Sequence, residues 1–377
     1  MSLTLTLASR NLFHDTLRFV ATMVGIVFSV VLVMVQMGLF LGFGHMVTTM
    51  IDHAATDLWV VPKNVKCFED PSLIDLKLRN KIATLDGVAT VVPLVIGFSD
   101  WRLESGEMTP VFVVGSDLRD GAMQPWNLVE GNVEDLKTPD AVILDELYKK
   151  KLGVTKLGET FELNGRRAHV VGFTHGIRAF TTTPYVFTSF KNAQAFTNLA
   201  EDQTVFILVK AAPGTNVAAL QSALQSRVRD VDVLTTAKFS SMTRIYWMFT
   251  TGAGVAVLIA ALLGLVVGVV VVAQTIYATT MDHIREYGTL KAMGAPNSYI
   301  YRVIITQAGI AAVVGYFLAM FVSVFIVRAS ESGGAAILLP WQMAVGIFFL
   351  TLLMCVSAAV VSINKVTSLD PAMVFRG

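Results

Sequence analysis

GAGVAVLIAALLGLVVGVVVVAQ, residues 252–274, decides the fold because it contains no charged side chain over its whole length. A helix that crosses about 30 Å of hydrocarbon needs roughly 20 mostly apolar residues, since every backbone amide must find its partner inside the helix. Three other stretches have the same length and character. The sequence therefore predicts four transmembrane helices, at residues 19–45, 244–276, 303–328 and 341–363.

The composition agrees with a chain that meets lipid. The mean hydropathy is +0.62, and only 15% of the residues are charged, which is outside the range of ordinary soluble proteins. The net charge of +1 carries no information about nucleic acid, and no nucleic-acid partner is expected for a chain of this class. The composition predicts an integral membrane protein in contact with membrane lipid.

The long segment between the first two spans, residues 46–243, changes to short alternating runs bounded by Gly, Pro and Asp, a pattern typical of strands. Near its end, residues 204–235 indicate strand, helix and strand in a βαβ unit, and residues 78–95 indicate a helix leading into a strand. The segment is predicted to be an α/β domain with a strand-rich inserted subdomain at about 116–195.

Orientation follows from the Lys and Arg residues near the membrane, which favour the cytoplasmic side. They occur before span one, between spans two and three, and after span four, whereas the short loop 329–340 carries only Glu331. Both termini, the 277–302 loop and the tail 364–377 are therefore predicted to be cytoplasmic, and the α/β domain extracytoplasmic. Residues 1–18 indicate an amphipathic helix in the headgroup plane, or else a basic tail.

The cytoplasmic loop contains HIREYGTLKAMGAPNSYIYR, residues 283–302, which has helical spacing. Ile284, Leu290 and Met293 tend to one side of this helix together with Tyr287, and a stop signal follows at Gly294 and Pro296. The pattern predicts a short helix parallel to the membrane. Its role is either that of an interfacial connector or that of a surface gripped by a cytoplasmic partner.

Catalytic and metal-binding motifs are missing from the sequence. There is no G-x-x-x-x-G-K-[ST], H-E-x-x-H, C-x-x-C or G-x-S-x-G. His45 and His53 are interpreted as surface residues, with metal or haem ligation as the alternative, and Cys67 as an inert thiol, with modification or intermolecular pairing as the alternative. We expect no catalytic, cofactor or metal site in this chain.

Polar and small residues inside the spans indicate helix packing. Gln36 and Gln274 suit hydrogen bonds between helices better than substrate contact, and Gly38-x-x-x-Gly42 and Gly264-x-x-x-Gly268 provide small faces. No Asp, Glu, Lys or Arg lies in the centre of a span, which argues against an ion path. The spans suit a bundle that pairs with a second copy of the chain.

The segment REYGTLKAMGAP, residues 285–296, resembles the signature R-E-(I/Y)-G-x-L-(K/R)-A-(L/M)-G-A of ABC transporter permeases of the MacB, FtsX and LolC superfamily, and is most similar to the DevC-like branch. Two further stretches support the resemblance, namely LASRNLFHDTLRFVATMVGIVFSVVLVMVQ and SLDPAMVFRG at the two ends. Asp282 and His283 replace the Glu-Arg of many members, which weakens any transfer of a MacB or LolC substrate.

The resemblance implies that the short helix is a coupling helix for a separate ATPase. Its implied residues are Arg285, Glu286 and Lys291 for charge pairing, Gly288 and Gly294 for close approach and helix termination, and Tyr287 and Leu290 within the same signature. ATP and Mg²⁺ are then bound by the partner ATPase. A stalk continuing span two through 242–246 would carry the displacement outward.

The implied function is the permease subunit of an ABC exporter in a bacterial inner membrane. The implied partners are a second copy, two copies of the ATPase, a periplasmic adaptor (membrane fusion protein) and a TolC-like outer-membrane channel, with a lipid-like or other hydrophobic substrate. The alternative is an FtsX-like signalling subunit that activates an extracytoplasmic hydrolase.

Overall fold

The computed structural model describes residues 16–181, 183–330 and 336–367. The chain divides into two compact units. The membrane unit comprises Met1–Gly42, Val255–Ser330 and Ala336–Gly377, and the α/β unit comprises Phe43–Gly254 with Glu331–Ala335. The predicted interfacial segment before Thr16, the centre of the 329–340 loop and the tail after Thr367 lie outside the described residues.

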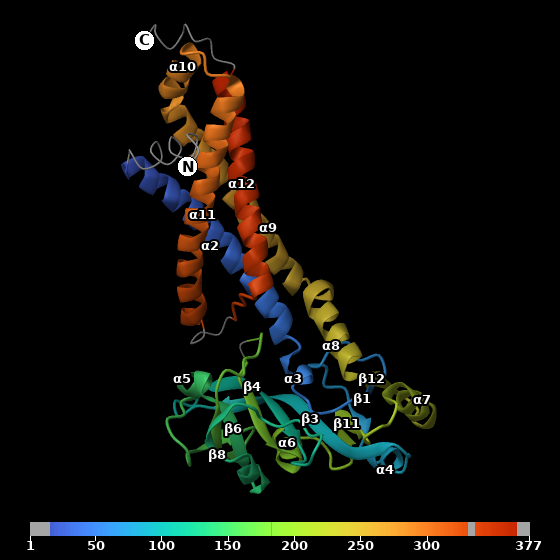
Figure 1. Cartoon of the computed structure of the whole chain (residues 1–377). Coiled ribbons are helices and arrows are strands. Elements are labelled where there is room, and N and C mark those ends of the chain that lie inside the picture. Colours follow the sequence, from blue (N-terminus) through green and yellow to red (C-terminus); the bar gives the residue numbers. More distant parts are fainter. Residues whose placement is uncertain (1–15, 182, 331–335, 368–377) are drawn as a thin grey trace. The chain divides into compact units, whose positions relative to one another are not determined.

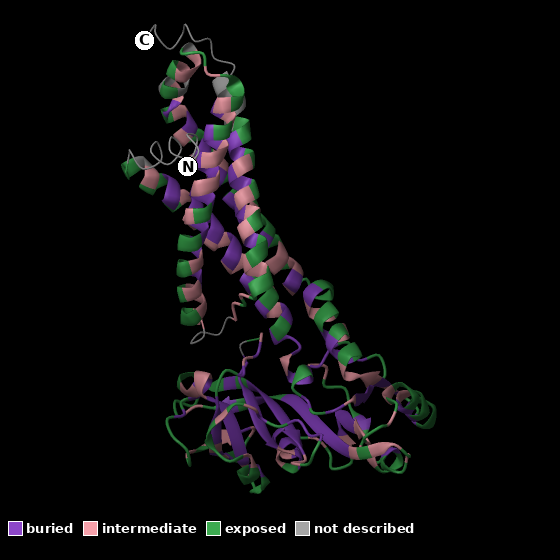
Figure 2. Cartoon of the chain, viewed as in Figure 1, coloured by how far each residue is buried: buried purple, intermediate pink, exposed green. Residues whose placement is uncertain are grey.

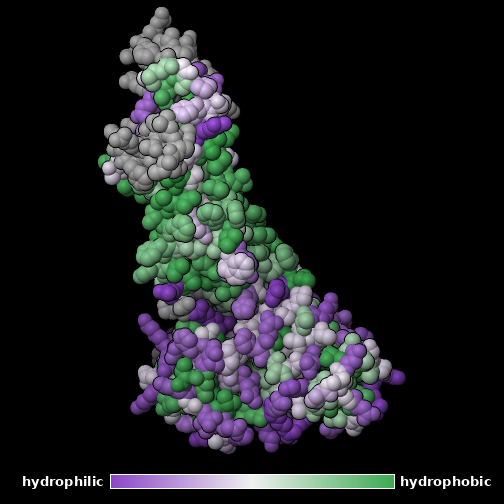
Figure 3. All heavy atoms as spheres, viewed as in Figure 1, coloured by the Kyte–Doolittle hydropathy of each residue, from purple (hydrophilic) through white to green (hydrophobic). Residues whose placement is uncertain are grey.

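Four helices in the described chain are long and apolar enough to cross a membrane, and Figure 3 shows their hydrophobic surface in green. This confirms the predicted fold class, because the α/β unit lies in the sequence between the first and second of these helices. The helices are α2 (Thr16–Met46), α9 (Ala253–Asp282), α11 (Asn297–Ser330) and α12 (Trp341–Thr367) (Figure 1).

Helices α2 and α9 run antiparallel and meet along a row of small residues. The hydroxyl groups of Thr22 and Thr279 are 2.9 Å apart at one end of this row. A Cβ added to Gly25 would lie 2.6 Å from the Thr275 hydroxyl, and one added to Gly264 would lie 3.1 Å from the Gln36 side chain. The glycines therefore permit the close approach of backbones that membrane helices use in place of hydrophobic burial.

The predicted Gly38-x-x-x-Gly42 face contacts an extended segment rather than a helix. The amide of Leu338 donates a 3.1 Å hydrogen bond to the Gly38 carbonyl. A Cβ added to Gly42 would lie 1.9 Å from the Ala336 carbonyl oxygen. Residues 336–338 therefore pack directly on α2 just before α12 begins.

Helices α11 and α12 lie side by side and complete the core of the membrane unit. The hydroxyl of Tyr316 on α11 donates a 2.8 Å hydrogen bond to the Ala344 carbonyl on α12. Gly315 allows α11 to approach α2, because an added Cβ would lie 2.5 Å from Ile26. Small side chains thus set the spacing of three of the four helices.

The α/β unit is built on one large mixed sheet of ten strands among the described residues. Its strand order is β12-β1-β11-β3-β4-β9-β6-β8-β5, and β7 pairs with β3 and β8. The β4–β9 and β6–β8 pairs are parallel and the other pairs antiparallel. The strands are β1 (Leu58–Pro62), β3 (Val88–Arg102), β4 (Met108–Ser116), β5 (Leu128–Gly131), β6 (Ala141–Asp145), β7 (Thr160–Leu163), β8 (Arg166–Thr174), β9 (Tyr185–Ser189), β11 (Phe206–Ala211) and β12 (Val231–Thr235).

Helices cover both faces of this sheet, so most of its strand residues are buried (Figure 2). Trp59 and Val61 of β1 join a core with α3 and α8, whereas Leu58 and Val60 join a core with α4 and α7 on the opposite face. This alternation follows from the two-residue period of a strand. The remaining elements are α3 (Thr49–Asp52), α4 (Leu78–Ala83), η1 (Val133–Lys137), η2 (Glu146–Tyr148), α5 (Lys149–Leu152), α6 (Phe190–Phe196), α7 (Val217–Arg227), α8 (Thr236–Ile245) and a small second sheet of β2 (Ile74–Asp75) and β10 (Gln203–Thr204).

The predicted βαβ unit is present as β11, α7 and β12, with β1 inserted between the two parallel strands. Asn216 starts α7 by accepting hydrogen bonds from the amides of Ala218 and Ala219. The 116–195 stretch shares a hydrophobic cluster with β3 and β4, to which α5 and α6 also contribute. Its strands nevertheless extend the same sheet, through the β4–β9 and β3–β7 pairs.

The residues of the predicted stalk, 242–246, are helical, but this helix does not run without interruption into span two. Helix α8 ends at Ile245, a π-helical segment η3 covers Tyr246–Thr250, and α9 begins only at Ala253. Gly252 has a φ of +78°, a left-handed conformation that interrupts a right-handed helix. We call residues 246–254 the junction. Its Gly254 packs so closely that an added Cβ would lie 2.4 Å from the Met248 backbone.

Candidate functional site

The charged stretch between α9 and α11 forms the short helix α10 (Ile284–Ala292). Its C-terminal end has the Schellman hydrogen-bond pattern: the Gly294 amide donates to the Lys291 carbonyl and the Ala295 amide to the Leu290 carbonyl, both at 3.0 Å. Gly294 adopts a φ of +93°, which this pattern requires. Helix α11 starts almost at once, so α10 is held between two spans by very short connections.

One side of α10 rests on the membrane unit. Ile284 and Leu290 are partly buried against its hydrophobic core. Met293, which the spacing placed on the same side, is instead 71% exposed, because it lies at the C-cap where the chain leaves the helix. Helical spacing alone gave no signal of this exposure, which follows from the C-cap position.

The polar residues of the predicted site are distributed along the same helix. Glu286 is 54% exposed at its side chain, and Gly288 and Lys291 are half-buried. Arg285 and Tyr287 belong to α10, but their side chains lie outside the described part of the structure. The structure thus brings these predicted positions together on one helix of nine residues.

The contact between His283 and Glu286 was not predicted from the sequence. His283 occupies the N-cap position of α10 with its side chain only 9% exposed, and its Nδ1 lies 3.1 Å from Oε1 of Glu286. The three-residue spacing between an N-cap and an acidic residue was the available signal. Glu286 therefore contacts the start of its own helix while part of its carboxylate faces outward.

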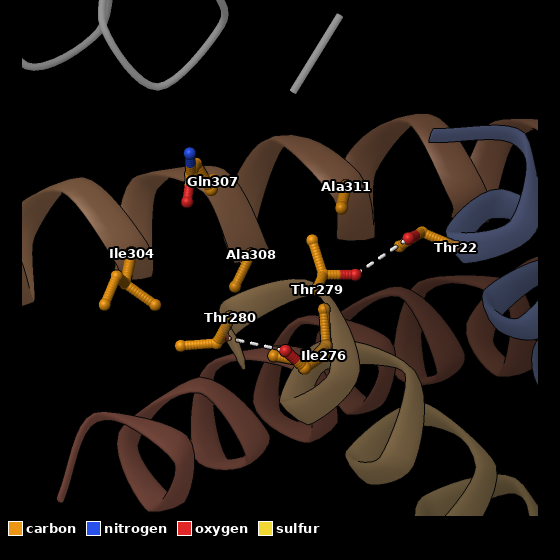
Figure 4. A pocket seen from close by; sticks show the side chains of 8 residues that line it. All are labelled: Thr22, Ile276, Thr279, Thr280, Ile304, Gln307, Ala308 and Ala311. Carbon is orange, nitrogen blue, oxygen red and sulfur yellow. Dashed lines mark hydrogen bonds between the residues drawn. The ribbon is translucent and has the colours of Figure 1, made fainter. Parts of the chain in front are cut away.

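A small polar cavity lies among α2, α9 and α11, close to the end of α9 that leads into α10 (Figure 4). Its volume of about 20 Å³ is enough for one water molecule. Thr22 and Thr279 line it with their paired hydroxyls. The hydroxyl of Thr280 donates a 2.7 Å hydrogen bond to the Ile276 carbonyl. Gln307 and the small residues Ala308 and Ala311 come from α11.

Of the other residues noted in the sequence, His45 and His53 are exposed and Cys67 is buried. His53 stacks on Trp126 with ring centroids 4.0 Å apart, and its Nδ1 lies 2.8 Å from the Thr49 carbonyl. Burial raises the pKa of the Cys67 thiol to about 12, with the nearby Glu69 carboxylate adding to the effect. Within the described ranges, no group of three or more His, Cys, Asp and Glu residues is arranged to hold a metal ion.

The described site is thus a short helix with a Schellman C-terminus, a partly exposed carboxylate at Glu286 and an exposed methionine at its C-cap. It projects between two apolar helices, where a partner protein could contact it. What the helix offers chemically is charge pairing and shape.

Comparison with known proteins assigns the two parts of the chain to known domain types. Residues 19–227 match the family model described as MacB-like periplasmic core domain, and residues 258–371 match the one described as FtsX-like permease C-terminal. Two curated proteins of Mycobacterium tuberculosis, one from each of two strains, are described as uncharacterized ABC transporter permeases. Each is 24% identical over 377 residues, which covers 96% of this chain and 96% of the relative.

Two solved structures are similar to the α/β part. The periplasmic region of MacB from Actinobacillus actinomycetemcomitans is 15% identical, covering 50% of this chain and 92% of that chain, with a TM-score of 0.39. The extracellular domain of the noncanonic ABC-type transporter YknZ from Gram-positive bacteria is 17% identical, covering 48% of this chain and 98% of that chain, with a TM-score of 0.34.

Proposed function

Because the chain belongs to the family of ABC transporter permeases with a MacB-like periplasmic core domain and an FtsX-like permease domain, we propose that it is the membrane subunit of an ATP-driven exporter that works by transmitting movement. A permease of this kind implies an ATPase partner. In the proposal, the partner binds ATP and Mg²⁺ and hydrolyses the nucleotide, and this chain receives the resulting stroke.

The position of α10 is the observation that carries the proposal. The α/β unit precedes α9 in the chain and α10 follows it. Helix α9 has 30 residues, which at 1.5 Å per residue is about 45 Å, more than the hydrocarbon thickness of about 30 Å. If α9 crosses the membrane once, α10 and the α/β unit face opposite compartments.

The residues of α10 then have distinct roles in the proposal. Arg285, Glu286 and Lys291 form charge pairs with the ATPase, with Glu286 also held by His283. Leu290 anchors the helix to the membrane unit, and Gly288 permits close approach to the partner. Met293 adds an apolar contact, since an exposed methionine adapts readily to a partner surface.

The two ends of the stroke are connected by α9. An ATPase can move only the part that it holds, and α10 is joined to α9 through His283 alone. Movement of α10 therefore displaces the end of α9, and the displacement reaches the α/β unit through the junction. We infer that substrate is handled outside the membrane or in its outer leaflet.

The proposed assembly contains two copies of this chain and two ATPase subunits in the inner membrane of a bacterium, with both termini of the chain cytoplasmic. A periplasmic adaptor and a TolC-like outer-membrane channel complete a tripartite system for a lipid-like or other hydrophobic substrate. The support for these finer points, including the DevC-like branch, is the sequence of α10 and the arrangement of the spans.

Purification of the full chain from its native membrane tests the proposed function. We expect an ATPase with a phosphate-binding loop to co-purify, together with an adaptor protein. Recovery of the ATPase with an extracytoplasmic hydrolase and no adaptor would instead support the FtsX-like signalling alternative. Absence of any ATPase from the purified complex would contradict both.

Replacement of Gly294 by alanine tests the contribution of the α10 end. A non-glycine residue in the left-handed conformation costs about 1 kcal/mol, so the last turn should fray, and we expect roughly fivefold weaker binding of the ATPase in a titration. Gly309→Ala is the matched control, since it makes the same change in α11, where an added Cβ meets nothing within 4 Å. Unchanged affinity in Gly294→Ala would exclude this end of α10 from the contact.

A further inference from the structure

The junction at residues 246–254 is held inside the α/β unit by a chain of aromatic rings. The ring of Trp247 lies 4.4 Å from that of Phe180, and Phe180 in turn lies 5.8 Å from Phe43 at the end of α2. Phe180 therefore contacts both the segment that enters the α/β unit and the segment that leaves it. Any displacement of the junction relative to the sheet has to change these contacts.

A carboxyl group holds the polar edge of the same tryptophan. Nε1 of Trp247 donates a 2.8 Å hydrogen bond to Oε2 of Glu69. Glu69 lies on the loop after β1, next to the buried residues Cys67 and Phe68. Phe68 packs against Trp59 and Phe206 of the central core. The Glu69–Trp247 bond therefore connects the core of the α/β unit to the π-helical segment.

We propose that Glu69 is a positioning residue of this transporter, which holds the junction closed through Trp247 and gives up a proton when the junction opens and its carboxyl group meets water. The junction is in this way both a mechanical joint and a site of proton release. Nothing in the family assignment or in the proposed role of α10 requires such a site.

The direction of the proton linkage follows from burial. Burial raises the pKa of Glu69 from its ordinary value of 4.5 to about 7, although the residue is partly exposed and the hydrogen bonds with Trp247 and Cys67 oppose the shift. When the junction opens, the group is hydrated and returns toward its ordinary pKa. The closed junction is therefore fully stabilised below about pH 4.5 and loses this stabilisation as the pH rises through about 7.

Two titratable neighbours of Glu69 are themselves affected by burial. Cys67 on the same loop and Tyr185 on β9 both have raised pKa values, for which burial is the main cause and the Glu69 charge an additional one. Asp70 adds further negative charge near Cys67. The Cys67 hydrogen bond lowers the pKa of Glu69, so it opposes the effect of burial without cancelling it.

The role of Glu69 in transport rests on the proposed function, whereas its hydrogen bond to Trp247 does not. If α9 delivers a stroke to the junction, the energy needed to open it should fall as the extracytoplasmic pH rises from acidic to alkaline. The hydrogen bond between Glu69 and Trp247 is tested without an ATPase. Failure of this test and failure of the exporter proposal therefore give different results.

Hydrogen–deuterium exchange of the full chain in lipid nanodiscs measures the opening directly. Protection factors of the amides at 246–254, corrected for intrinsic exchange, should fall on the order of tenfold from pH 5.5 to pH 8. In Glu69→Gln the amide oxygen still accepts the indole hydrogen bond but cannot titrate, so protection should stay high and independent of pH. In Glu69→Ala protection should be lower throughout this range.

Asp70→Asn is the matched control, because it neutralises an adjacent acid without touching the Trp247 bond, and it should retain the wild-type profile. A flat wild-type profile would overturn the proposal, and so would a pH dependence in Glu69→Gln equal to that of the wild type. The second comparison decides the question even if the alanine variant does not fold.

Discussion

A chain carrying Arg285→Glu together with Glu286→Lys is expected to insert into the membrane normally but to co-purify with at least tenfold less ATPase. The double change leaves the net charge unaltered and reverses the order of charges on α10. Like charges then face each other across the proposed contact, which costs several kcal/mol in well-packed interfaces, whereas tenfold weaker binding needs only about 1.4 kcal/mol. The yield of ATPase per membrane-inserted chain is the measurement.

A matched swap is available on the α/β unit. Arg102 and Glu162 form an exposed cross-strand ion pair at 3.1 Å between β3 and β7. Arg102→Glu with Glu162→Arg exchanges the same kinds of charge there, and the ATPase yield should stay at the wild-type level. Equal ATPase recovery from the α10 variant and this control would show that α10 is not the coupling element.

Trp59→Ala should lower the free energy of unfolding by about 3–5 kcal/mol, as is usual for truncation of a buried tryptophan. Trp59 is fully buried on β1. The centroid of its ring lies 5.1 Å from that of Phe239 on α8. Its Nε1 donates a 3.2 Å hydrogen bond to the Thr236 hydroxyl at the start of α8. The cavity would separate the sheet from the helix that leads to the junction. Denaturant unfolding of the full chain in detergent checks the effect.

The companion variant for this measurement is Phe98→Ala. Phe98 is another aromatic residue of the same sheet, on β3, but it is 55% exposed. Its truncation should cost about 1 kcal/mol or less, because most of its surface already meets solvent. Comparable losses in the two variants would mean that Trp59 does not anchor the core in the way that its contacts indicate.

The membrane helices could be predicted from the sequence because their signal is strong and local. Length and the absence of charge are sufficient to find a span, and α2, α9, α11 and α12 all follow that rule. The alternating pattern within residues 46–243 likewise indicated strands from local sequence alone. Strand β1 shows no such alternation, because LWVVP is apolar throughout. Helices cover both faces of the sheet at this strand, so side chains on both sides of it are buried.

The features that sequence reasoning missed depend on tertiary contacts. Residues 242–252 have the composition of a continuing helix, and only the left-handed Gly252 and the close packing of Gly254 on Met248 show that it is broken. The insertion of β1 between β11 and β12 likewise joins residues far apart in the chain. Local propensity carries no information about such pairings.

The candidate site was predictable in its position but not in its contacts. The helical spacing and the Gly294 stop located α10 to within a residue or two, since caps and periodicity are local signals. The contact of His283 with Glu286 and the exposure of Met293 depend on how α10 lies on the membrane unit. The roles of the α10 residues toward an ATPase stay a prediction.

The side of the membrane on which α10 lies is the central claim, and thiol labelling measures it. Met293→Cys and Ser105→Cys, made one at a time, place a cysteine at an exposed position at the C-cap of α10 or in the turn between β3 and β4, in a chain whose own cysteines are both buried. With a membrane-impermeant reagent on intact spheroplasts, we predict labelling at position 105 and labelling at position 293 only after permeabilisation. Labelling of both positions in intact spheroplasts would contradict the account.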